Sequence, residues 1–191
     1  MGAPFMTSLI LLGIVAVVIL YAVYVYNNLV TARQLVQEGY SGIDVQLKKR
    51  ANLIPNLVAA VKGYLKHERE TLEKLTELRA RAMGMSENTD PAQRSAVEQE
   101  ISSLLGKIMV AVENYPDLKA SQNVLDLQQQ LAQIEHDIQM ARRYYNGTVR
   151  ENNILVESFP SNLIASIFKF GKAEYFELED ASARQVPPVQ L

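Results

Sequence analysis

The two histidines come closest, by type and neighbours, to a metal-binding or proton-transfer site. His67 is followed three positions later by Glu70, whereas di-metal sites in helical bundles use the opposite order, Glu-x-x-His, on two helices. Glu135, His136 and Asp137 are consecutive, so on a helix their side chains point in different directions. We therefore predict that both histidines lie on solvated helix faces and that the chain has no metal-binding residues.

The chain also has little material for nucleophilic catalysis. It has no cysteine, which excludes thiolate catalysis, cysteine zinc sites and disulfides. No Gly-x-Ser-x-Gly motif is present, and a serine triad would have to use one of the two histidines. Gly39 and Gly42 resemble no phosphate-binding loop because a helical pattern continues through them, so we expect both at a close helix contact. The sequence predicts no catalytic or cofactor-binding residues and a protein that is not an enzyme.

The charge balance argues against nucleic acid as a partner. Lys and Arg number 19 against 21 Asp and Glu, which leaves a formal net charge of -2, whereas phosphate contacts need a surplus of basic side chains. With no tryptophan and 7% aromatic residues, the chain also lacks rings for stacking bases or sugars. Its 191 residues suit one folded unit with additional segments at the termini.

Residues 9–26, from Leu9 to Tyr26, form an apolar segment without a charge or an amide. As a helix rising 1.5 Å per residue, this segment covers roughly 27 Å, close to the ~30 Å hydrocarbon core of a bilayer. Tyr21, Tyr24 and Tyr26 gather at its end, where amphipathic rings favour the membrane interface. We predict a transmembrane helix that contacts the lipid bilayer from Leu9 to Tyr26.

A cleaved signal peptide is the alternative interpretation of this segment. Signal peptides have a basic leader, a shorter apolar region and a small-x-small cleavage site, none of which is found here. No Lys or Arg precedes the apolar segment, whereas Arg33 and later Lys48, Lys49 and Arg50 follow it. The positive-inside rule then predicts an N-terminus outside and a cytoplasmic remainder. In a bacterium this is a single-pass protein of the inner membrane.

After the anchor, apolar side chains recur at helical spacing. The first row predicts a helix that continues from the anchor, kinks at Pro55 because proline lacks an N–H group, and ends at residues 84–89. Its apolar members are Leu29, Val36, Tyr40, Ile43, Leu47, Ile54, Leu57, Val61, Leu65, Leu72 and Leu75.

Two more long helices and a short one are expected. Asp90 followed by Pro91 is typical of a capped helix start, and Pro116 breaks the chain after this second helix. The apolar row of the second helix is Val97, Ile101, Leu104, Ile108 and Tyr115. The third helix has the spacing of a coiled-coil seam, formed by Val124, Leu127, Leu131, Ile134, Ile138, Ala141, Tyr145 and Val149. A short apolar helix is expected over residues 162–170.

These elements predict an all-α fold. We expect an N-terminal transmembrane helix that continues into an antiparallel bundle of long helices, three long plus one short. Residues 1–27 would form the N-terminal tail and anchor, and residues 28–171 the cytoplasmic bundle. Residues 172–191 are acidic, contain prolines, and would be extended or loosely docked.

Two short patterns have alternative interpretations. On a straight helix the basic triplet Lys48, Lys49 and Arg50 lies roughly 35 Å beyond the span, too far for attraction to lipid headgroups across a Debye length of ~8 Å. We therefore expect the triplet on a solvated face or at an intermolecular contact. The C-terminal residues 189–191 have the apolar-x-apolar pattern that PDZ domains bind, and so short a match often arises by chance.

Several stretches resemble the LemA family of membrane-anchored bacterial proteins. These are YNNLVTARQLVQEGYSGIDVQLKKRANLIPNLVAAVKGYLKHERETLEKL (26–75), NYPDLKASQNVLDLQQQL (114–131), ARRYYNGTVRENN (141–153) and FPSNLIASIFKF (159–170). The resemblance implies an anchor with its N-terminus outside and a cytoplasmic helical bundle. The family has no established enzymatic chemistry, so the resemblance implies none here. Its members include magnetosome-associated membrane proteins, and many of its genes lie near genes for membrane metalloproteases.

Two hypotheses of function follow. The first is a non-enzymatic, membrane-anchored scaffold that self-associates into a homo-oligomer to organise or shape the membrane. The second is an adaptor or regulator of a membrane protease or other envelope protein, which rests on the family's gene neighbourhoods and the C-terminal pattern.

Overall fold

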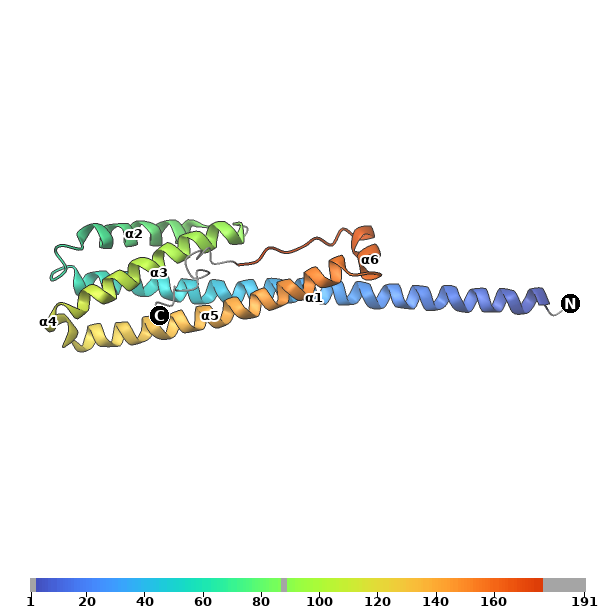
Figure 1. Ribbon diagram of the computed structural model, residues 1–191, viewed down its shortest axis with the longest axis horizontal. Helices are drawn as coiled ribbons and strands as arrows, with labels where there is room; N and C mark the ends of the chain where they lie inside the picture. Colours follow the sequence, from blue (N-terminus) through green and yellow to red (C-terminus); the bar gives the residue numbers. More distant parts are fainter. Residues whose placement is uncertain (1–2, 87–88, 177–191) are drawn as a thin grey trace, which may run out of the picture. The chain divides into compact units, whose positions relative to one another are not determined.

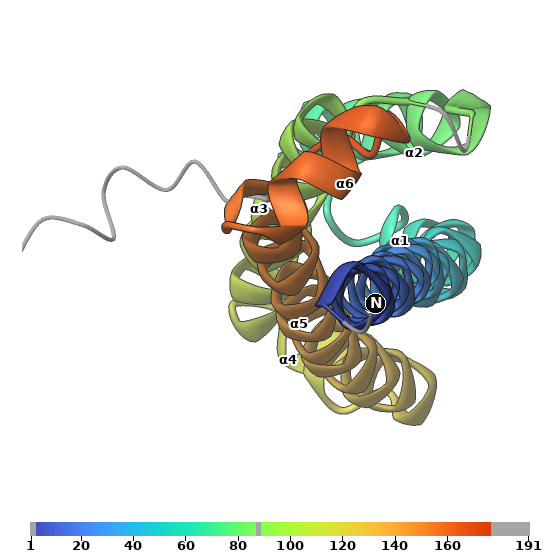
Figure 2. The same ribbon diagram turned by 90° about the vertical axis from the view of Figure 1, so that its right-hand side faces the viewer.

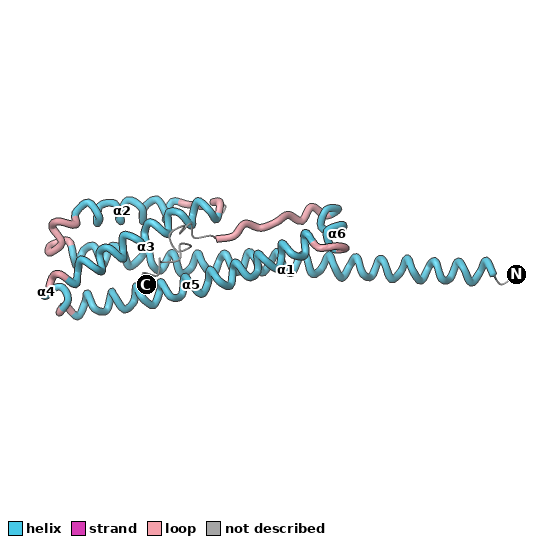
Figure 3. Tube along the Cα trace, viewed as in Figure 1, coloured by secondary structure: helices cyan, strands magenta, loops and turns pink. Residues whose placement is uncertain are grey.

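The computed structural model describes residues 3–86 and 89–176. In this part of the chain every regular element is a helix, and Figure 3 shows no strand. The prediction of an all-α fold is therefore confirmed. The helices are α1 (Ala3–Val61), α2 (Arg69–Gly84), α3 (Pro91–Glu113), α4 (Pro116–Lys119), α5 (Gln122–Glu157) and α6 (Ser161–Ile167), as labelled in Figure 1.

The chain forms two compact units, to which α1 and α5 both contribute. Unit 1 combines Met1–Tyr40 with Tyr144–Ala173, and unit 2 combines Ser41–Arg143 with Glu174–Leu191. The domain boundaries expected after residues 27 and 171 concern the membrane surface and the tail, and they stay predictions.

In unit 1, α6 packs beside α1 where the apolar segment of α1 ends. Val25 and Leu29 of α1 are buried together with Ala165 of α6. Figure 2 looks at α1 from its N-terminal end and shows α6 extending across the view, and Figure 1 shows the same crosswise direction from the side. α6 therefore lies at a steep angle to α1. It begins and ends within three residues of the range predicted for a short apolar helix.

The contact between α1 and α5 in unit 1 centres on Gly39. A Cβ atom at this position would lie 3.1 Å from the Cα atom of Tyr145, so the prediction of a close helix contact is confirmed for Gly39. The same prediction was wrong for Gly42, where an added Cβ would meet nothing within 4 Å. Further along α5, Asn153 holds the segment that follows α6. Its Oδ1 accepts from the Ala173 N–H at 2.8 Å, and its Nδ2 donates to the Ala173 carbonyl at 2.9 Å.

In unit 2, segments of α1, α2, α3 and α5 run alternately in opposite directions (Figure 1). The antiparallel arrangement was expected from the short connections between the helices. The apolar rows face one another here, because burying them removes apolar surface from water. The core consists of Ile54, Leu57, Val61, Leu65, Leu72, Leu75, Leu78, Ala82, Val97, Ile101, Leu104, Leu105, Ile108, Val112, Leu118, Val124 and Leu131.

The first predicted helix is shorter than the sequence pattern indicated. α1 passes Pro55 but ends at Val61, and α2 begins only at Arg69, so the expectation of one helix reaching Gly84 was wrong. Leu65 lies in the intervening turn and is still 1% exposed, which explains why the apolar row continues although the helix does not. α2 is thus a separate helix, and unit 2 contains one more long element than predicted.

The predicted start of the second helix is confirmed, while α3 ends at Glu113, before Tyr115, the last member of its predicted row. Asp90 caps α3 by accepting the Ala92 N–H at 2.8 Å, with Pro91 as the first helical residue. The chain breaks again at Pro116, which opens the short α4. The apolar row of α5 is buried or half-buried over its whole length, from Val124 to Val149.

Candidate functional site

The N-terminal part of α1 carries apolar side chains that nothing in the described chain covers. Between Thr7 and Val61 this helix contains an 18-residue window with a mean hydropathy of 2.8, of which 6% is buried. Leu12 and Leu20 are 68% and 69% exposed, and contact of such surface with water is unfavourable. By length and composition α1 could cross a membrane, and it is the one helix of the described residues that could.

An aromatic and cationic cluster follows this apolar segment in unit 1. The ring of Tyr26 meets the edges of Phe168 and Phe170, with ring centres 4.8 Å and 5.6 Å apart. The guanidinium carbon of Arg33 lies 5.1 Å from the centre of the Phe170 ring, within range of a cation–π interaction. Tyrosine and arginine side chains of this kind are common where a helix leaves a bilayer.

In unit 2, Arg50 lies at the centre of a network that joins α1, α3 and α5, in which Arg50 and Glu98 are buried and the Glu135 side chain is 37% exposed. The Arg50 side chain is 2% exposed. Nη2 donates to the Glu98 carboxylate at 2.6 Å, and Nη1 donates to the Glu135 carboxylate at 2.8 Å and to the Ser102 hydroxyl at 2.5 Å. The Ser102 hydroxyl lies 3.0 Å from Glu135 Oε1, which accepts from it. Each of the three helices therefore contributes a charged group to one cluster.

A second ion pair lies beside this network. Arg94 of α3 donates to Asp44 of α1 at 2.6 Å, and the side chains of both are buried or nearly so. The other oxygen of Asp44 pairs with Lys48 at 2.6 Å. Arg142 of α5 lies with its guanidinium carbon 5.1 Å from the centre of the Phe176 ring. Burial lowers the pKa of the Arg142 guanidinium, because the charged form loses hydration; Glu135 opposes this shift and Arg50 adds to it.

The arrangement around Arg50 is suited to holding helices in register. Removing one partner of a buried ion pair leaves an uncompensated charge, so the loss of Arg50 alone should destabilise the packing of the three helices. The Ser102 hydroxyl is hydrogen-bonded to Arg50 and Glu135, and the cluster contains no histidine that could act as its base. We therefore assign the cluster a structural role.

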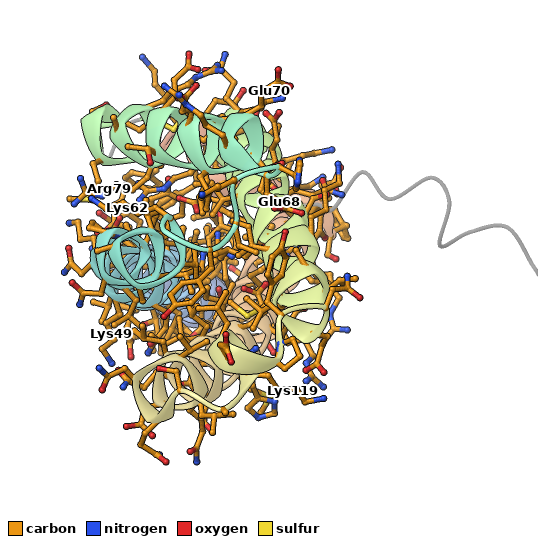
Figure 4. The ribbon with its side chains drawn as sticks, turned by 90° about the vertical axis from the view of Figure 1, so that its left-hand side faces the viewer. Lys49, Lys62, Glu68, Glu70, Arg79 and Lys119 are labelled. Carbon is orange, nitrogen blue, oxygen red and sulfur yellow. The ribbon has the colours of Figure 1, made fainter. Side chains whose placement is uncertain are left out.

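The prediction of solvated helix faces is confirmed for His136, whereas His67 is exposed in a turn and not on a helix. His67 lies in the turn between α1 and α2, and His136 lies on α5; both are exposed. Glu70 of α2 is exposed as well, and Figure 4 shows it pointing outward from the helices. Within residues 3–86 and 89–176, no group of three or more His, Cys, Asp or Glu could hold a metal ion.

The basic triplet is divided between surface and core. Lys48 and Lys49 are exposed, and Figure 4 shows Lys49 at the outer edge of α1. For Arg50 the prediction of a solvated face was wrong, since the residue is 1% exposed. A signal for this was present: Arg50 falls three positions after Leu47 and four before Ile54, on the same helix face.

Glu98 and Glu135 were also missed as members of a site. Each lies next to the apolar row of its helix, Glu98 beside Val97 and Glu135 beside Ile134. A carboxylate at the edge of an apolar row usually reaches solvent, so only the position of Arg50 in the folded unit shows that these two side chains turn inward.

Much of the predicted C-terminal tail lies outside the described residues, and with it the 189–191 pattern. In the part of this tail that is described, the Phe176 side chain is 2% exposed and its ring packs against the Arg142 guanidinium in unit 2.

The described residues thus define an all-helical protein with one helix able to cross a membrane and a second unit held by a buried ion network. The chain belongs to the LemA family, whose sequence profile matches residues 39–191.

Several curated proteins are similar to this chain over most of their length. Protein LemA of Metamycoplasma hominis is 27% identical over 185 residues, which cover 95% of this chain and 83% of that protein. Magnetosome proteins MamQ 1 and MamQ 2 of Paramagnetospirillum magneticum are each 24% identical over 96% of this chain and 77% of their own length. None of these names states an enzymatic activity.

Proposed function

We propose that this protein is a membrane-anchored scaffold that self-associates to organise or shape the bacterial inner membrane, without an enzymatic activity of its own. The observation that carries the proposal is the change of environment along α1. Apolar side chains from Leu9 to Leu20 are exposed, whereas residues from Ile43 to Val61 of the same helix are buried at every turn. One helix therefore supplies both a bilayer-compatible surface and part of a folded unit.

The charge distribution supports a defined orientation. No basic residue precedes Leu9, and Arg33, Lys48 and Lys49 follow the apolar segment on exposed positions. By the positive-inside rule the N-terminus lies outside the cell and unit 2 in the cytoplasm. The protein then crosses the inner membrane once.

An open apolar groove in unit 2 supports self-association. It lies between α3 and α5, encloses about 550 Å³, and is lined largely by apolar side chains such as Leu105, Met109 and Leu131. Val110, which also lines the groove, is 69% exposed. An anchor confines copies of the chain to two dimensions and so raises their effective concentration, which favours contacts that are weak in solution. The relationship to proteins named for the magnetosome fits a structural role better than a catalytic one.

The mass of the full-length protein in mild detergent tests this proposal. We expect a homo-oligomer larger than a dimer by mass photometry or light scattering, whereas residues 28–191 alone should be mostly monomeric. A particle containing one chain and its micelle, across several detergents and concentrations, would contradict the scaffold.

A pair of variants tests the groove. Val110→Glu places a charge in its lining and should lower the mass of the particle, while Val45→Glu changes a residue of α1 that is also exposed, at 50%, and does not line the groove. If both variants keep the oligomer, the groove is not the contact.

A monomeric particle would favour the second hypothesis, an adaptor of a membrane protease. The test for an adaptor is a pull-down with residues 186–191 deleted, since an adaptor that uses its C-terminus then loses its partner.

A further inference from the structure

The helix α6 and the residues around it expose an unusual amount of apolar surface. Phe159 is 79% exposed, Leu163 55%, Ile167 69% and Phe168 55%. Leu163 and Ile167, four residues apart, lie on one side of α6, and Phe159 lies in the turn that leads into the helix. We call Phe159, Leu163 and Ile167 the α6 stripe. Such a patch on a folded protein marks a surface that contacts something apolar.

The opposite side of α6 is attached to α1. Ala165 is 1% exposed and packs with Val25 and Leu29, and the ring of Phe168 lies 4.8 Å from that of Tyr26. Val25 and Tyr26 are the last residues of the apolar segment of α1. If that segment spans the bilayer, these contacts place α6 at the depth where the hydrocarbon ends and the headgroups begin.

The direction of α6 also fits this depth. It extends crosswise to α1 (Figures 1 and 2), so a bilayer crossed by α1 would have α6 along its surface. A helix standing parallel to α1 could expose only one end to the interface, whereas a crosswise helix exposes a whole side.

The charges of the segment suit a membrane surface as well. Residues 158–173 contain Lys169 and Lys172, and the acidic residues Glu157 and Glu174 flank them. Lys172 forms an ion pair with Glu157, and Lys169 is exposed. Arg33 lies beside this segment, over Phe170. Helices that lie in the membrane interface combine such basic groups with phenylalanine and leucine on the apolar side.

We propose that α6 is an interfacial helix, with the α6 stripe inserted among the headgroups and upper acyl chains of the bilayer that α1 crosses. The inference rests on the proposed anchor, because α1 sets the depth of α6. The ligand of the stripe is the lipid surface, and a second protein chain on the same surface is the competing outcome.

Fluorescence quenching in liposomes tests the proposal on the full-length protein. The chain has no cysteine, so single cysteines can carry an environment-sensitive nitrobenzoxadiazole label. The stripe positions are Leu163→Cys and Ile167→Cys, both exposed enough to accept the label without repacking a core. The liposomes contain phosphatidylcholine and phosphatidylglycerol, with a nitroxide lipid carrying its spin label either near the headgroup or deep in the acyl chain.

Two further cysteines are controls. Val17→Cys lies in the apolar segment of α1 and is 66% exposed, and Val45→Cys, 50% exposed, lies on α1 within unit 2. We expect labels at Leu163 and Ile167 to emit at shorter wavelength than the label at Val45 and to lose most of their fluorescence with the shallow nitroxide. The label at Val17 should be quenched best by the deep nitroxide, and the label at Val45 by neither.

The possible results separate the two proposals. Quenching at Val17 but at neither stripe position would overturn the interfacial helix and leave the anchor standing. A blue shift at the stripe without quenching by lipid would place the stripe against protein and also overturn the proposal. Absence of quenching at Val17 would overturn the anchor itself.

Discussion

Gly39 of α1 and Tyr145 of α5 meet backbone to backbone. A Cβ atom on Gly39 would lie 3.1 Å from the Cα atom of Tyr145 and 3.4 Å from the Thr148 hydroxyl oxygen. The Tyr145 side chain is itself buried and faces the ring of Tyr40 at 5.7 Å between ring centres. Glycine therefore determines how closely these two helices approach within unit 1.

Two glycine substitutions should have opposite effects. Gly39→Ala forces α1 and α5 apart, because the atom that blocks the new methyl group belongs to the backbone, and overpacking of this kind costs about 1–3 kcal/mol. Gly42→Ala, in the same helix with nothing within 4 Å, should stabilise the protein by about 0.5–1 kcal/mol through its higher helix propensity. Urea unfolding of the full-length protein in detergent, followed by circular dichroism, measures both. Equal changes would contradict the close contact.

Arg50→Met should destabilise the protein by about 3–5 kcal/mol, because Glu98 stays buried without its partner. The exposed neighbour Lys49 provides the control, since Lys49→Met should change the free energy of unfolding by no more than about 0.5 kcal/mol. Replacing Glu98 and Glu135 by leucine together with Arg50→Met should recover much of the loss, as it removes the charges as a group. If Arg50→Met behaves like Lys49→Met, the network is not buried.

Phe176→Ala should cost about 3–5 kcal/mol, the usual range for a fully buried phenylalanine. The effect would show that the chain after α6 is part of unit 2, where Phe176 packs under Arg142. Tyr175→Ala, one position earlier and 38% exposed, should have a smaller effect. Thermal unfolding measures the stability of the two variants. If Tyr175→Ala lowers the stability as much as Phe176→Ala does, Phe176 is not a buried part of unit 2.

The orientation of the anchor can be measured with single cysteines at Ser8 and Ser86. An impermeant maleimide added to intact spheroplasts should label Ser8→Cys only, because the basic residues follow the apolar segment. Labelling of Ser86→Cys before lysis would reverse the orientation and the cytoplasmic assignment with it.

The sequence by itself was sufficient for the helical class, the apolar segment of α1, the start of α3 and the buried rows of the long helices. The physical reason is that these features are local. Hydrophobic spacing shows which face of a helix is buried. The cap of α3 joins the Asp90 carboxylate to the N–H of Ala92, only two residues further on.

Only the tertiary structure decided where the first long helix ends, which charges are buried and which glycine lies at a close helix contact. Leu65 keeps the apolar spacing inside a turn, so the pattern could not distinguish one helix from two. Arg50 follows Lys49 in the sequence yet lies in the core, because Glu98 and Glu135 reach it from helices 48 and 85 residues away. Gly39 and Gly42 look alike in the sequence, and they differ because a Cβ atom on Gly39 would meet the backbone of α5 whereas one on Gly42 would meet nothing within 4 Å. Such contacts join residues far apart in the chain, and spacing along one helix carries no record of what lies opposite.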